Sequence, residues 1–157
     1  MITFKKGSAK DIGDAIRIGK MLPELFTTEA FKKMRNDFDD HELYVAMKHD
    51  QMVGFCSITV KNKCVAEITW LGVNPDEHRK GIGEQLIGFV SRELNTNGRK
   101  LLEVKTLDQS CDYEPYERTR LFYEKCGFLH VDSIDPYPGW EVGNPCAIYI
   151  KILNDLF

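Results

Sequence analysis

Hydrophobic positions in the first half of the chain change from a helical to a strand-like spacing. Apolar side chains recur at near-helical intervals over 12–22, after a capping box formed by Ser8 and Asp11 and before Pro23. A second helical stretch covers about 27–36. Strand-like runs follow over 43–48, 53–60 and 64–73, and a short polar turn makes the first two a hairpin. The middle of the chain therefore predicts an antiparallel meander.

The second half returns to helical spacing and then alternates. A helix with its apolar side chains on one stripe is predicted from Gly83 to a stop signal at Asn97-Gly98. The remaining elements are a strand over 101–106, a short helix over 119–125, and strands over 128–134 and 146–152. The order of two helices, three strands, helix, strand, helix and two strands indicates an α+β or mixed α/β fold, in one domain covering 1–157.

Composition and charge exclude several classes of protein. The chain has 21 basic and 24 acidic side chains, hence a net charge of −3, whereas proteins that coat nucleic acid show a basic excess. No apolar run approaches the about 18 residues of a membrane span, and the first residues lack the apolar core of a signal peptide. We therefore expect a cytoplasmic protein without nucleic-acid or membrane partners.

Cysteine and histidine are too dispersed along the chain for a metal centre. The five cysteines form no CxxC pair, and the four histidines are scattered. Neither a structural zinc site nor a disulfide framework fits this spacing. We expect reduced thiols and no metal.

The most informative segment is the loop over 73–86. A strand runs into a loop with Gly81 and Gly83 and then directly into a helix, and the N–H groups of a first helical turn can bind phosphate. Arg79 and Lys80 would add positive charge. Alternatively, the glycines only join the strand to the helix. The segment lacks the third glycine of the dinucleotide fingerprint and the Gly-Lys-Ser/Thr of a Walker A loop.

Two sequence blocks resemble a known family. The block Val73-x-Pro75-x-x-His78-Arg79-Lys80-Gly81-Ile82-Gly83-x-x-Leu86 resembles the acetyl-CoA-binding motif of the GCN5-related N-acetyltransferase (GNAT) superfamily, whose core is Arg/Gln-x-x-Gly-x-Gly/Ala. The block 119–128 resembles that family's FYxxxGF segment, with Phe122-Tyr123 and Gly127-Phe128. The resemblance spans nearly the whole chain. It implies a central, mostly antiparallel twisted sheet flanked by helices, with two strands splayed at the acetyl-CoA site.

The resemblance also implies which residues bind acetyl-CoA, the cosubstrate. Backbone amides of the glycine loop would hold the pyrophosphate: Arg79, Lys80, Gly81, Ile82 and Gly83. The strand end Leu71, Gly72 and Val73 would bind the pantetheine arm and polarise the thioester. Phe122 would be a core aromatic residue at the same coenzyme site. His78 stands where the family usually has Arg or Gln, at a position expected to contribute mainly backbone.

Tyr123 is the first catalytic candidate. Aminolysis of a thioester expels a thiolate, and a nearby phenol can donate a proton to the sulfur as it leaves. The resemblance places the family's general-acid tyrosine at Tyr123. Alternatively, Tyr123 and Phe122 are two packed aromatics on a short helix.

Glu67 is the candidate general base, because the attacking amine must lose a proton. In the family's histone acetyltransferases, a catalytic glutamate lies at a similar place on this strand. Alternatively, Glu67 is an exposed or salt-bridged strand residue, and Glu103 and His78 are the next candidates. Strict alternation along the strand would place five side chains on one face: Val65, Glu67, Thr69, Leu71 and Val73.

Acidic and aromatic residues indicate the acceptor side. The stretch 107–118 contains Asp108, Asp112, Tyr113, Glu114, Tyr116 and Glu117. Together with the acidic patch at 37–42, these residues would suit a cationic amine through ion pairs and cation–π contacts. Alternatively, they are solvated faces of loops. Trp140 either shapes the acceptor pocket or anchors its loop.

The sequence therefore predicts an acetyl-CoA-dependent N-acetyltransferase that modifies a primary amine of a small molecule or peptide. Direct transfer in a ternary complex is expected, since Cys111 and Cys126 have no evident histidine partner for an acyl-cysteine route. The alternatives are a non-catalytic acyl-CoA-binding sensor or interaction module, and a plain nucleotide- or phosphate-binding domain. A homodimer is a further option, because dimers are common in the family.

Overall fold

The structure is a computed structural model and describes residues 1–154. Its strands are β1 (Ile2–Lys6), β2 (Glu42–Lys48), β3 (Gln51–Val60), β4 (Val65–Val73), β5 (Leu101–Leu107), β6 (Leu129–Ile134) and β7 (Cys146–Ile152). Its α-helices are α1 (Ile12–Lys20), α2 (Thr28–Asp40), α3 (Ile82–Thr96) and α4 (Glu114–Lys125). Short 3-10 turns, η1 (Ala9–Asp11) and η2 (Pro75–Glu77), precede α1 and α3. None of the helices within 1–154 is long and apolar enough to cross a membrane.

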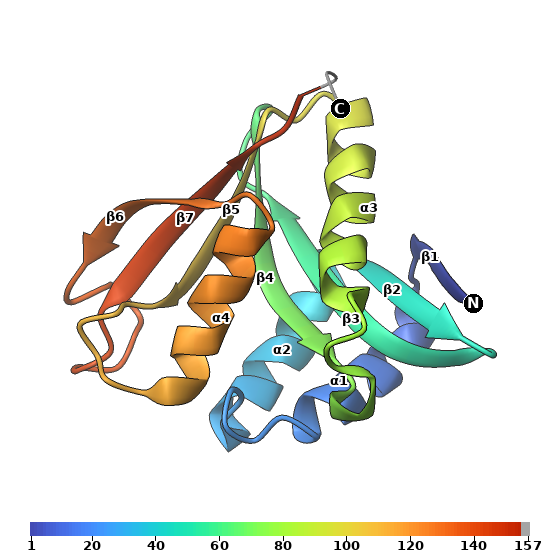
Figure 1. Cartoon of the computed structure of the whole chain (residues 1–157), viewed down its shortest axis with the longest axis horizontal. Coiled ribbons are helices and arrows are strands. Elements are labelled where there is room, and N and C mark those ends of the chain that lie inside the picture. The colour runs from blue at the N-terminus through green and yellow to red at the C-terminus, as the bar shows by residue number, and fades with distance from the viewer. Residues whose placement is uncertain (155–157) are drawn as a thin grey trace.

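The seven strands form one sheet in the order β1-β2-β3-β4-β5-β7-β6, with helices on both faces (Figure 1). Neighbouring strands are antiparallel except β4 and β5, which are parallel. Side chains of α1 and α2 form one core cluster with β2 and β3, and side chains of α3 and α4 form a second cluster on the other face. The predicted mixed α+β fold with a mostly antiparallel sheet is confirmed.

The strands β4 and β5 separate partway along their length. Their parallel pairing runs only from Val65–Leu101 to Ile68–Val104, although β4 continues to Val73 and β5 to Leu107. Beyond the last pair the two strands diverge, as Figure 1 shows between β4 and β5. On the β5 side, the backbone groups of β4 past Ile68 therefore lack a strand partner. The splayed strands that the resemblance implied are present.

A β-bulge in β4 changes which face its side chains reach. Ser57 pairs with Trp70 and Ile58 pairs with Ile68, so Thr69 is an extra residue without a partner on β3. The bulge shifts the alternation by one position. Leu71 consequently packs with Ile68 against the α3 and α4 cluster, while Trp70 packs against the α1 and α2 cluster. The expectation that Leu71 and Val73 share a face with Glu67 and Thr69 was wrong.

Three elements differ from the sequence prediction. The strand β1 was not predicted, because its five residues acquire their structure only by pairing with β2. Helix α4 begins at Glu114 rather than at 119, with Pro115 in its first turn, where a missing N–H costs nothing. The polar sequence 114–118 has no apolar stripe, so its helical state was not visible. Asp37, Asp39 and Asp40 of the acidic patch lie in the last turns of α2, which extends past the predicted end at 36.

Candidate active site

The loop before α3 turns the chain sharply at two residues. Gly81 is the N-cap with a φ of 78°, and Arg79 has a φ of 65°. The N–H of Gln85 donates to the Gly81 carbonyl at 3.0 Å. The three N–H groups between them, at 82–84, have no acceptor within the helix. Together with the dipole of a 15-residue helix, they form a site suited to an anion.

His78 fixes the shape of this loop. Its Nε2 lies 2.7 Å from the carbonyl oxygen of Val73, and because a carbonyl can only accept, Nε2 carries the hydrogen and donates it. The side chain thus joins the loop to the end of β4. His78, which departs from the family pattern, therefore contacts backbone in this structure.

The charges around the loop are partly paired. Glu77 accepts hydrogen bonds from Lys80 at 3.0 Å and from Lys48 at 3.1 Å. These two ammonium groups lower the pKa of the Glu77 carboxyl. Arg79 has no such acidic partner among the described residues and is exposed. Arg79 is therefore the free positive charge beside the open N–H groups.

A cleft of about 560 Å³ lies between the diverging ends of β4 and β5. Its walls are completed by α4, one face of α2 and the loops at 25–27 and 137–144. Of the predicted site residues, Glu67, Leu71 and Tyr123 line the cleft. The glycine-loop residues 78–83 do not line it; they lie at the start of α3 (Figure 1), where Gly83 faces Phe122 of α4. Gly72 is buried beneath the Phe55 ring.

Tyr123 projects from α4 into a packed aromatic setting. Its ring meets Phe122 at 5.4 Å and Phe128 at 5.3 Å between centroids, both edge-on. The residue is only 5% exposed, and burial raises the pKa of its phenol far above the ordinary value. The phenol therefore keeps its proton at neutral pH. Its hydroxyl has no hydrogen-bond partner within residues 1–154, so its proton is available to a ligand.

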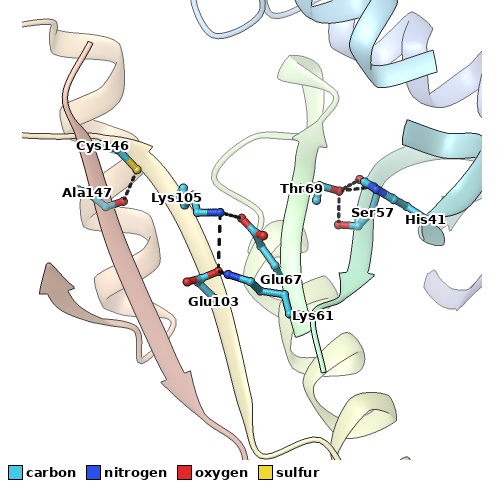
Figure 2. A network of polar contacts seen from close by, with 9 residues as sticks. All are labelled: His41, Ser57, Lys61, Glu67, Thr69, Glu103, Lys105, Cys146 and Ala147. Carbon is cyan, nitrogen blue, oxygen red and sulfur yellow. Dashed lines mark hydrogen bonds and ion pairs between the residues drawn. The ribbon is translucent and has the colours of Figure 1, made fainter. Parts of the chain in front are cut away.

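Glu67 belongs to a charge network that crosses from β4 to β5 (Figure 2). Lys105 Nζ donates to Glu67 Oε2 at 2.9 Å and lies 3.9 Å from Glu103 Oε2, which also accepts from Lys61 at 2.7 Å. Burial alone would lower the pKa of Lys105, but the hydrogen bonds to Glu67 and Tyr137 and the two carboxylates raise it. Lys105 is thus a lasting positive charge in the cleft wall. The sequence pointed to Glu67 and Glu103 but carried no signal for Lys105.

A second polar group occupies the α2 side of β4 (Figure 2). His41, the residue after α2, places Nδ1 3.0 Å from Thr69 Oγ1, which lies 2.6 Å from Ser57 Oγ. One turn earlier in the helix, Asp37 accepts a hydrogen bond of 2.9 Å from Trp70 Nε1. His41, Asp37 and Thr69 all line the cleft. Apart from the acidic patch containing Asp37, no signal in the sequence indicated them, because the bulge brings them together.

Aromatic side chains close the outer end of the cleft. Tyr137 and Trp140 are 5.6 Å apart between ring centroids, and Lys105 Nζ lies 5.3 Å from the Tyr137 ring. Tyr116 lines the cleft, and its hydroxyl donates to the Leu25 carbonyl at 2.8 Å. Tyr113 similarly donates to Glu24. Trp140 therefore shapes the cleft wall, and the two tyrosines hold α4 to the loop before α2.

Most acidic residues of the 107–118 stretch do not reach the cleft. Asp108 is buried. Burial alone would raise the pKa of its carboxyl, but hydrogen bonds from Ser133 and Ser110 lower that pKa. Glu114 pairs with Arg118. Asp112 and Glu117 border a separate hollow beside α4. These carboxylates are not in position to bind an amine in the main cleft, in contrast to Asp37 and Glu67.

Thr106 supplies a free hydroxyl in the cleft. The residue is 4% exposed, and its Oγ1 has no hydrogen-bond partner within the described residues. A buried hydroxyl without a partner costs about 1–3 kcal/mol. A ligand that reaches it would supply the missing bond. Within 1–154, no group of three or more His, Cys, Asp or Glu side chains is arranged to hold a metal ion.

The sequence matches the model of the acetyltransferase (GNAT) domain over residues 39–129. This match covers more than half of the chain and includes both sequence blocks. The chain belongs to the GNAT family of acetyltransferases. A search of curated proteins found no match.

Solved structures share the fold over almost the whole chain. A protein assigned to the GNAT family from Desulfovibrio desulfuricans has a TM-score of 0.85 at 20% identity, covering 98% of this chain and 100% of its own. The ribosomal-protein-S18-alanine N-acetyltransferase of Escherichia coli has a TM-score of 0.77 at 17% identity, covering 100% and 97%. A GNAT acetyltransferase from Elizabethkingia anophelis, solved with acetyl-CoA bound, has a TM-score of 0.73 at 22% identity, covering 97% and 98%. At these identities the likeness establishes the fold.

Proposed function

We propose that this acetyltransferase moves an acetyl group from acetyl-CoA directly to a primary amine bound in the cleft between β4 and β5. The observation that carries this proposal is Tyr123, a buried phenol that keeps its proton and lines the open end of the splayed strands. The anion site at α3 and the cleft are joined through Phe122, which touches Gly83 and neighbours Tyr123. A cosubstrate with phosphates at one end and a thioester at the other would extend along this path.

Acetyl-CoA is supported as the donor by the groups that the chain presents. The N–H groups at 82–84 and the charge of Arg79 suit its pyrophosphate. The unpaired edge of β4 at Leu71–Val73 suits the amides of its pantetheine arm, because extended backbone recognises amides as a sheet edge does. The related Elizabethkingia anophelis enzyme binds acetyl-CoA. We assign Leu71–Val73, His78–Gly83 and Phe122 to this cosubstrate.

In the proposed reaction the neutral amine attacks the thioester carbon, and the C–S bond breaks as the C–N bond forms. Tyr123 donates its proton to the leaving sulfur and regains one from the nitrogen. Burial raises the pKa of the Cys126 thiol and that of the Cys146 thiol to about 11, which leaves little thiolate for an acyl-cysteine intermediate. This supports direct transfer in one ternary complex.

Glu67 remains the carboxylate that meets the incoming amine. It lines the cleft and was predicted to be the base, yet its oxygen already accepts a hydrogen bond from Lys105. The ion pair with Lys105 still allows Glu67 to attract the ammonium group of the substrate or to remove a proton through a water molecule. With Asp37 and the rings of Trp70, Tyr137 and Trp140, Glu67 favours an amine next to an apolar or aromatic group.

The test has two parts. Calorimetric titration should show binding of acetyl-CoA and none of ATP or NAD, and acetyl-CoA should release free CoA only when a suitable primary amine from a broad panel is added. Absence of acetyl-CoA binding would overturn the proposal. Binding without turnover on any amine would instead support a non-catalytic acyl-CoA module.

A further inference from the structure

The hydrogen bonds around Thr69 favour one arrangement of the protons on the neighbouring side chains. Thr69 Oγ1 lies 3.2 Å from the Ser57 carbonyl, 2.6 Å from Ser57 Oγ and 3.0 Å from His41 Nδ1. We assign the single hydroxyl hydrogen of Thr69 to the Ser57 carbonyl, which can only accept. The two lone pairs of Thr69 then accept from Ser57 Oγ–H and from His41 Nδ1–H.

In this arrangement neutral His41 carries its hydrogen on Nδ1 and has a bare lone pair on Nε2. That nitrogen has no hydrogen-bond partner within residues 1–154. The imidazole ring is half-buried and lines the cleft. Its backbone is fixed as well, because the His41 N–H donates to the Asp37 carbonyl at 2.8 Å at the end of α2. A preset tautomer with a free acceptor in a substrate cleft is the arrangement that a general base requires.

The other candidate base is less free to act. Glu67 would have to exchange its hydrogen bond from Lys105 for one from the substrate, with the Lys105 charge still beside it. His41 needs no such exchange. In Figure 2 the two groups lie on opposite sides of β4, so they offer separate places for a proton.

We propose that His41 Nε2 takes the proton that activates the acceptor amine; this rests on the proposed N-acetyltransferase function. The overall reaction converts R–NH3⁺ and acetyl-CoA into the acetamide R–NH–CO–CH3, CoA–SH and one H⁺. His41 removes the first proton and passes it to water. The nitrogen then bonds to the acetyl carbon as the C–S bond breaks, and the second proton reaches the sulfur through Tyr123. Thr69 is a positioning residue that holds the His41 tautomer.

The experiment compares His41→Asn with His49→Asn by steady-state kinetics. Asparagine can keep a donor to Thr69 in place of Nδ1–H but has no counterpart to Nε2. His49 is an exposed residue of the β2–β3 turn with a positive φ, which asparagine tolerates. The His41→Asn variant should lose about 100-fold or more in kcat/KM for the amine while its acetyl-CoA Kd is unchanged. The His49→Asn variant should keep wild-type kinetics.

Two further measurements separate a base from a structural residue. Free imidazole should restore part of the activity of His41→Ala, at least tenfold over the unassisted variant. Thr69→Val should lower kcat, whereas Thr69→Ser should keep it. Retention of activity in His41→Asn, or a loss in His41→Ala that imidazole does not relieve, would overturn this assignment. A wild-type protein without turnover on any amine would instead overturn the function on which it rests.

Discussion

Gly83 and Phe122 are in such close contact that a β-carbon at position 83 would lie 3.0 Å from Phe122 Cζ. This contact joins the first turn of α3 to α4 and brings together the two blocks of the chain that resemble GNAT motifs. The glycine is thus required by packing as well as by any approach of a phosphate. Tyr123 follows Phe122 directly, so a shift of the Phe122 ring reaches the proposed acid.

The first prediction concerns this contact. Gly83→Ala should weaken acetyl-CoA binding and lower kcat, since the Phe122 ring, which also packs on Tyr123, must move. Gly88→Ala in the same helix is the matched control, because its β-carbon would contact only Arg92 Nη1, at 3.5 Å. That variant should gain about 0.5–1 kcal/mol of stability and keep its activity. Thermal unfolding measures the stability of each variant, and calorimetry measures its acetyl-CoA affinity. Equal acetyl-CoA affinities for Gly83→Ala and Gly88→Ala would contradict the role given to the contact.

The second prediction concerns Tyr123. Tyr123→Phe should reduce kcat by about 100-fold or more, because the departing thiolate loses its proton donor. Acetyl-CoA affinity should change little, since the ring that packs against Phe122 and Phe128 remains. Tyr113→Phe is the control: its hydroxyl donates to Glu24 outside the cleft. Unchanged CoA release by Tyr123→Phe would remove Tyr123 from the mechanism.

The third prediction is that one substitution at Thr106 raises stability and weakens ligand binding. Thr106→Val removes a buried hydroxyl without a partner, so the free protein should become more stable, by about 1 kcal/mol. The same change should weaken binding of the ligand that would supply the missing hydrogen bond in the cleft. Ser91→Ala, which removes the other such hydroxyl within 1–154, should stabilise without any effect on binding. A Thr106→Val protein with unaltered ligand affinities would show that the hydroxyl is not used.

The fourth prediction concerns alkaline pH. The pKa of Lys105 is raised in the folded protein, so the folded state holds this proton more tightly than the unfolded chain does. The resulting stability is fully present below the unfolded value of about 10.4 and is lost as the pH rises through the folded value. Denaturant unfolding at pH 8 and pH 11 should show a larger loss for wild type than for Lys105→Met. Buried tyrosines contribute in the same direction to both proteins, so the difference isolates Lys105.

The sequence allowed prediction of those features that depend on neighbouring residues. The apolar stripe of α3, its glycine start and the hairpin of β2 and β3 are local patterns, and all three are present. The bulge at Thr69 could not be predicted, because it exists only in the register of β4 against β3. For the same reason the pairs His41–Thr69 and Glu67–Lys105, 28 and 38 residues apart, required the structure.

The short parallel ladder between β4 and β5 has a consequence for the mechanics of the sheet. Four residue pairs, from Val65–Leu101 to Ile68–Val104, form the strand ladder that joins its two halves. A bound ligand would span the open end of this seam and add the cross-links that the strands do not make. Amide hydrogen exchange at 101–104 should therefore slow more on ligand binding than exchange in β2 and β3, whose ladder is already long. In this way binding in the cleft would stiffen the seam between the two halves of the sheet.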